Sequence, residues 1–148
     1  MGCDSKCPVK LENNIILTRV TRAILPLIVL FGLYVQMHGK LSAGGGFQAG
    51  VIVAAAFILY ALVFGLEALT AIIPLSWQKA GACAGVLLYA GVGFFSLLAG
   101  GHFLDYNLLG STGPEGQFIG IFLVEIGVGL TVCSVMLMMY CLFAGRKK

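Results

Sequence analysis

One acidic residue, Glu125, interrupts a long apolar run near the end of the chain. The run covers residues 117–143 and contains no other Asp, Glu, Lys or Arg. A charged side chain at the centre of a membrane helix costs about 2.5 to 3.5 kcal/mol on insertion scales. The carboxylate must therefore face protein, water or an opposite charge. The first hypothesis is a proton or cation path, and the alternative is a hydrogen-bonded carboxyl group that holds helices together.

A second carboxylate, Glu67, follows the apolar segment 47–66. One hypothesis places it at the mouth of a cation path or in an ion pair with a neighbouring subunit. The simpler interpretation is an interfacial carboxylate paired with Arg19, Arg22 or Lys79.

A glycine-rich segment, residues 38–50, separates the first two apolar runs. Its histidine could titrate near neutral pH, although a loop histidine bonded to the backbone is the simpler interpretation. Its three consecutive glycines could cradle an anion through their amides, but no Walker-type Lys follows them. We expect instead that these glycines let the next helix start in close contact with a neighbour. The candidate residues of this segment are His38, Gly39, Gly44, Gly45, Gly46 and Phe47.

The remaining reactive residue types do not form a recognisable active site. The chain has two histidines and five cysteines. Cys3 and Cys7 alone provide too few ligands for a metal site, and their role stays open. Cys83, Cys133 and Cys141 fall in apolar segments and are expected to act as small apolar side chains. We therefore predict that this chain by itself is not an enzyme and holds no metal or cofactor of its own.

The composition indicates an all-α membrane protein. Apolar residues make up 59% of the 148 residues, charged residues 10%, and the mean hydropathy is +1.01. Soluble domains carry roughly 25% charged residues. Segments near residues 15–37, 47–66, 80–99 and 117–143 are long enough to span a bilayer. The predicted organisation is a polar leader (1–14), a domain of four transmembrane helices (15–143) and a basic tail (144–148).

The basic residues predict the orientation of these helices. Eight of the nine fall on one side of the predicted membrane, and Lys40 alone falls on the other. Positive residues gather on the cytoplasmic side, so the N and C termini are both expected in the cytoplasm. The net charge of +3 follows from this rule and is no argument for binding nucleic acid. The eight residues are Lys6, Lys10, Arg19, Arg22, Lys79, Arg146, Lys147 and Lys148.

Proline and glycine give further expectations about the spans. Pro26 should sit early in the first helix, where a missing amide costs little. The apolar stretch 47–73 is longer than a bilayer requires, so it should either tilt or end in an interfacial piece. Residues 74–79 should form an interfacial turn anchored by Trp77. Three small-residue pairs predict close helix packing: Gly46 and Gly50, Gly81 and Gly85, Gly116 and Gly120.

The glycine-rich segment resembles a family signature. His38-Gly39, a short gap and Gly44-Gly45-Gly46-Phe47 are similar to the pattern in the B subunit of Mrp-type multisubunit cation/proton antiporters. The resemblance extends to Leu25-Pro26, Gly65-Leu66-Glu67 and Pro74-Leu75, and covers roughly residues 15–143. The family usually has Pro where this chain has Ala43, which suggests a divergent branch.

This resemblance implies a small non-catalytic subunit of the prokaryotic cell (inner) membrane. Its partners would be other membrane subunits of a hetero-oligomeric complex, and the transported ions would be Na+ and H+. By the Gly-Leu-Glu match the resemblance points to Glu67, whereas Glu125 rests on membrane physics alone. An alternative is the homologous subunit of an electron-driven membrane-bound hydrogenase or sulfane reductase. A further alternative is a self-sufficient small proton-coupled exporter, although the comparable exporters carry their glutamate in the first span.

Overall fold

Helices account for nearly all of the chain that the structure describes. The computed structural model describes residues 15–39, 45–98, 100, 104 and 113–146, and within these ranges it contains helices and turns but no strand. Four helices are long and apolar enough to cross a membrane, which confirms the predicted all-α fold with four spans. The helices are α1 (Ile15–His38), α2 (Gly46–Phe64), α3 (Leu66–Ile72), α4 (Leu75–Leu98) and α5 (Gly113–Gly145).

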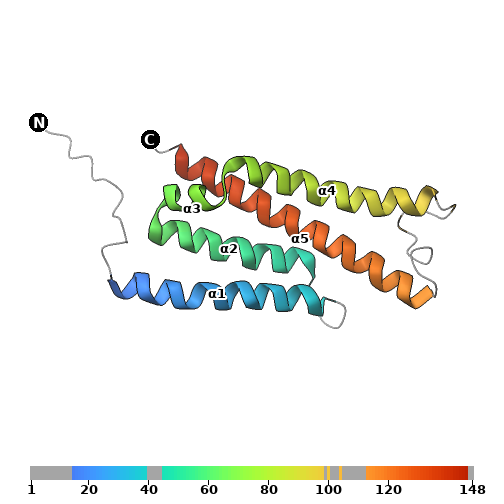
Figure 1. Ribbon diagram of the computed structural model, residues 1–148, viewed down its shortest axis with the longest axis horizontal. Helices are drawn as coiled ribbons and strands as arrows, with labels where there is room; N and C mark the ends of the chain where they lie inside the picture. Colours follow the sequence, from blue (N-terminus) through green and yellow to red (C-terminus); the bar gives the residue numbers. More distant parts are fainter. Residues whose placement is uncertain (1–14, 40–44, 99, 101–103, 105–112, 147–148) are drawn as a thin grey trace, which may run out of the picture.

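The long helices lie side by side in the order α1, α2, α5, α4 (Figure 1). The last helix in the sequence is thus inserted between the second and the fourth, and it crosses them obliquely. The start of α1, the short α3 and the end of α5 lie at one end of the molecule, and the turn after α1 lies at the other. Because α5 packs on both α2 and α4, sites formed between helices are expected along α5.

Glycines allow α5 to approach its two neighbours closely. A Cβ added at Gly50 of α2 would lie 2.6 Å from the carbonyl oxygen of Gly129. A Cβ at Gly85 of α4 would lie 2.5 Å from the carbonyl oxygen of Gly127. Backbone contact of this kind is how membrane helices associate when lipid removes the hydrophobic drive between them. Two predicted small-residue pairs, Gly46/Gly50 and Gly81/Gly85, are therefore confirmed as packing sites.

The third predicted pair lies near the start of α5. Gly116 and Gly120 are both buried. Their contact with a particular neighbouring helix stays a prediction.

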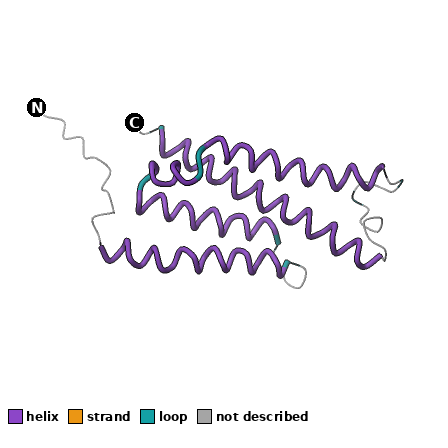
Figure 2. The backbone as a smooth tube through the Cα atoms, viewed as in Figure 1, coloured by secondary structure: helices purple, strands orange, loops and turns teal. Residues whose placement is uncertain are grey.

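The second span ends at a sharp break rather than continuing to residue 73. Gly65 has φ of 97°, a conformation that side chains with a Cβ rarely adopt. The chain then forms α3, whose Leu69 is fully buried. Figure 2 shows loop backbone on both sides of α3. The excess length of the apolar stretch therefore forms a separate short helix instead of extending the second span. Its position at the membrane interface stays a prediction.

Two expectations about proline were wrong. α1 begins at Ile15, so Pro26 is the twelfth of its 24 residues instead of an early one. The apolar residues before Arg19 join the helix, because a long arginine side chain can extend toward the interface while its stem stays in lipid. Residues 75–79 belong to α4 rather than to a turn, because Pro74 can precede a helix without loss of a bonded amide. Trp77 lies exposed in the first turn of α4.

The packing of α4 on α5 gives a testable prediction. Replacing Gly85 by Ala should destabilise the chain by about 1 to 3 kcal/mol, because the new methyl group would overlap the Gly127 carbonyl. The same replacement at Gly91, also in α4, meets no atom within 4 Å and should be neutral or slightly stabilising. Unfolding of the purified chain by SDS in mixed micelles measures both. Equal effects at the two positions would contradict the packing described here.

Candidate functional site

Glu125 of α5 lies beside the first residues of α2. A Cβ added at Gly46 would overlap the carbonyl oxygen of Glu125 and lie 2.7 Å from its carbonyl carbon. A Cβ at Gly45 would lie 3.5 Å from Oε1 of the Glu125 carboxylate. The two features that the sequence singled out for separate reasons, the acid within a span and the glycine run, therefore meet in space.

The carboxylate is placed where an α-helix is electropositive. The first amides of a helix have no partner within it, and the aligned peptide dipoles add a partial positive charge there. Gly45 is the N-cap of α2 and provides no side-chain cap, and the first turn of α2 contains no acidic residue. The Glu125 side chain is thus the nearby negative group that can balance this end of α2. Within the described residues, no hydrogen bond or ion pair engages the carboxylate.

A side chain from α1 completes the site. Gln36 and Gly46 both approach Gly129, one helical turn after Glu125: a Cβ added at Gly129 would lie 2.9 Å from Oε1 of Gln36 and 3.0 Å from the carbonyl oxygen of Gly46. The Nε2 atom of Gln36 is buried and has no hydrogen-bond partner within the described residues. We call this group the three-helix junction; it consists of Gln36, Gly45, Gly46, Glu125 and Gly129.

The junction lies well inside the length of α5. Twelve residues of α5 precede Glu125, which corresponds to about 18 Å of helix. Figure 1 shows α4 and α5 extending beyond the start of α2 at this end of the molecule. A carboxylate, an unbonded amide and a helix start are thus grouped where the flanking helices are apolar. Such a group can hold a proton, a cation or water between helices, or it can fix the packing of three helices.

Glu67 lies at the other end of α2 and does not join this site. It is exposed in the first turn of α3, just after the Gly65 break. The 19 residues of α2 separate it from the junction, which is about 28 Å along a helix. Nearby, the Arg22 guanidinium lies 5.3 Å from the centre of the Phe64 ring. A single path that uses both glutamates would have to run along the whole of α2.

The other residues of the glycine-rich segment are spread around the turn after α1. His38 is exposed in the last turn of α1, and its ring stacks on Tyr34 with the ring centres 4.2 Å apart. Gly39 lies in the turn. Phe47 is exposed on α2 rather than packed in the junction. Gly44 lies outside the described residues, so its expected role stays a prediction.

Sequence reasoning missed three polar or small residues that matter for packing. Gln36 could not be identified from the sequence, because a single glutamine in an apolar helix belongs to no characteristic spacing. Gly129 could have been found as the small residue four positions after Glu125, on the same helix face. Gln78 is almost fully buried and donates a hydrogen bond from Nε2 to the Ile73 carbonyl at 3.1 Å, which ties the end of α3 to α4. Within the described residues, no three His, Cys, Asp or Glu side chains gather as metal ligands.

The fold and this site define a class: a multi-pass helical membrane protein with polar groups placed between its helices. The family model described as a domain related to the MnhB subunit of Na+/H+ antiporter matches residues 16–138. The chain belongs to this family, as the glycine-rich segment had indicated.

Bacterial relatives match along most of their length. A putative antiporter subunit mnhB2 of Staphylococcus haemolyticus is 31% identical over 142 residues, which cover 92% of this chain and 98% of the relative. The B subunit of a Na(+)/H(+) antiporter from Alkalihalophilus pseudofirmus is 32% identical over 131 residues, covering 82% and 90%. A protein of the same name from Bacillus subtilis is 29% identical over 130 residues, covering 81% and 90%. With its four spans, the chain is a multi-pass protein of the bacterial cell membrane.

Two glutamines that lie between helices offer a matched test of the junction. Replacing Gln36 by Met should leave stability unchanged or raise it by about 1 kcal/mol, because the amide nitrogen removed is buried and unbonded. Replacing Gln78 by Met should lower stability by about 1 kcal/mol, because the Ile73 carbonyl loses its donor, although the Gln78 Oε1 atom that is also removed is buried and unbonded within the described residues. SDS unfolding of the purified variants measures both values. A large loss at Gln36 would mean that the amide is bonded in the membrane.

Proposed function

We propose that this chain is a small non-catalytic membrane subunit of a multisubunit Na+/H+ antiporter. The observation that carries the proposal is the family match over residues 16–138, together with relatives named as antiporter subunits that align along nearly their whole length. The partners would be the other membrane subunits of the complex. Na+ and H+ would be its transported ions, with no resident metal or cofactor in this chain.

The three-helix junction is the part of the chain that we propose to border the ion path. Its carboxylate lies beside the start of α2. The Gln36 amide group, which lies against Gly129 one turn further along α5, has a nitrogen with no partner within the described residues. Polar groups within a membrane helix are costly and commonly mark ion or proton pathways. In the assembled complex, water held at the junction would satisfy both groups, because water can donate to the carboxylate and accept from the amide; the purified chain lacks the neighbouring subunits that would hold this water.

We also propose the orientation of the chain. Four basic side chains, Arg19, Arg22, Lys79 and Arg146, are exposed on the helix segments that gather at the end of the molecule opposite the α1–α2 turn. Positive residues flank the cytoplasmic face of membrane proteins. This end would therefore face the cytoplasm, together with the leader (1–14) and the basic tail (144–148), and the junction would lie toward the outer face.

The names of the relatives favour an antiporter over an electron-driven hydrogenase or sulfane reductase. They also favour a subunit over a self-sufficient exporter. In the antiporter, the larger subunits would perform the exchange, and this chain would shape part of the path or an interface.

The proposal predicts the effect of Glu125→Gln in the assembled complex. Na+-dependent proton exchange in membrane vesicles should fall by about tenfold, equivalent to about 1.4 kcal/mol in the transport barrier. Assembly on a native gel should be unchanged, because glutamine keeps the size and hydrogen-bonding capacity of the side chain. Glu67→Gln is the comparison variant, since Glu67 is the other ion-path candidate and lies exposed at the other end of α2; it should reduce exchange much less.

The other outcomes separate the alternatives. If Glu125→Gln assembles and exchanges normally, the carboxylate serves packing and the junction does not border the path. If the variant fails to assemble, Glu125 belongs to an interface between subunits. If the wild-type chain does not purify with antiporter subunits, its role as a subunit is wrong.

A further inference from the structure

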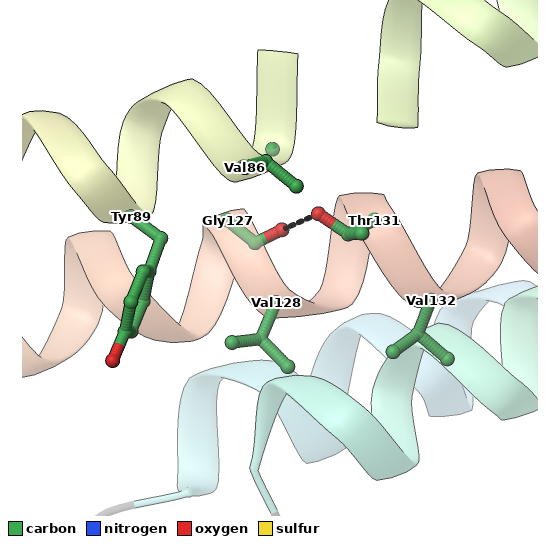
Figure 3. A pocket seen from close by; sticks show the side chains of 7 residues that line it. Val86, Tyr89, Gly127, Val128, Thr131 and Val132 are labelled. Carbon is green, nitrogen blue, oxygen red and sulfur yellow. Dashed lines mark hydrogen bonds between the residues drawn. The ribbon is translucent and has the colours of Figure 1, made fainter. Parts of the chain in front are cut away.

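A groove lies along the surface where α4 and α5 meet (Figure 3). Residues of α4 form one side of it, and residues of α5 on the side toward α2 form the other. The volume of the groove is about 270 Å³. The two glycines at its floor, Gly85 and Gly127, bring the backbones of α4 and α5 together: a Cβ at Gly127 would lie 2.9 Å from the Gly85 carbonyl oxygen. The lining residues are Gly85, Val86, Tyr89, Gly127, Val128, Thr131 and Val132.

The hydroxyl group of Thr131, which lines this groove, already has a hydrogen-bond partner within α5. It donates to the Gly127 carbonyl of the preceding turn at 2.8 Å, and Figure 3 draws this bond. Val128 and Val132 extend from α5 toward α2, and Val86 closes the side formed by α4. The surface is therefore apolar and smooth, of the kind that packs against another helix.

Tyr89 is the exception at the edge of the groove. Its ring extends from α4 across α5 (Figure 3), and within the described residues its hydroxyl forms no hydrogen bond. Tyr89 lies 14 residues after the first residue of α4 and nine before the last, about 13 to 14 Å from the nearer end. Tyr89 is therefore in the middle part of this apolar span, away from the helix ends near which tyrosine usually lies in membrane proteins.

The chemistry of the occupant follows from this hydroxyl. A lipid acyl chain could fill the apolar groove, but it has no acceptor for a phenolic O–H. A transmembrane helix can fill the same space and offer a Ser, Thr, Asn or Gln side chain as an acceptor. We propose that this groove, bordered by Tyr89, docks a transmembrane helix of another subunit that carries small residues and one such polar side chain. The inference rests on the proposed function, since it requires a complex with other membrane subunits.

Photocrosslinking in the assembled complex tests the occupant. A benzophenone amino acid at Val86 places the probe in the groove and keeps Tyr89, whereas the same probe at Leu87 points away from it on α4 and is the matched control. We expect an adduct between position 86 and a different subunit, and a weaker one or none from position 87. Adducts from position 86 only with lipid, or only with a second copy of this chain, would overturn the proposal.

A second variant tests the hydroxyl itself. Tyr89→Phe keeps the ring and removes the proposed donor, so the fraction of the chain retained in the complex under mild detergent should fall about threefold, as expected for one hydrogen bond between membrane helices. Leu87→Ala should leave retention unchanged. Unchanged retention of Tyr89→Phe would contradict the hydrogen bond. If the wild-type chain itself does not purify with other subunits, the proposed function is wrong. If it purifies with them but position 86 forms no adduct, only the proposed docking site is wrong.

Discussion

The close contact of α5 with the helices on both of its sides is the constraint on which the rest of the structure depends. In lipid, apolar side chains gain little by leaving the solvent, so helix association relies on close packing and on bonds between helices. Glycines on α2, α4 and α5 provide that contact, and backbone atoms of Gly50 and Gly85 face the carbonyls of Gly129 and Gly127. The same contacts create both the three-helix junction and the groove. Bulkier residues at these positions would separate the helices and remove both features.

The position of Glu125 is tied to this packing. Its main chain lies so close to Gly46 that any side chain there would collide with it, and this proximity leaves its carboxylate beside Gly45. A charged group that would be costly in lipid is thereby placed near the unpaired amides of a helix start. Packing and electrostatics therefore act together at one point. Geometry requires a glycine at position 46, whereas a Cβ at Gly45, the N-cap of α2, would make only ordinary contact with the Glu125 carboxyl group.

Much of the fold could be predicted from the sequence, because apolar length and charge placement determine the spans. The junction could be predicted only in parts. Glu125 and the glycine run were both identified, but their contact depends on the register of α2 against α5, which are far apart in the sequence. Gln36 has no pattern that marks it. The segment around Pro74 was misjudged because a proline before a helix and a proline in a turn have the same local signature.

Two of the polar groups that lack a partner within the described residues bear on whether the chain acts alone. The Gln36 amide and the Tyr89 hydroxyl both lie along apolar helices, and neither has a partner within the described residues. A self-sufficient exporter would bear the cost of both groups in its resting state. A subunit need not, because neighbouring helices or water held between subunits can supply the missing acceptors. The two groups lie on different sides of α5: Gln36 belongs to α1 and Tyr89 to α4. Helix α5 packs on more of the chain than any other helix, and yet the polar groups beside it lack partners that neighbouring subunits could provide.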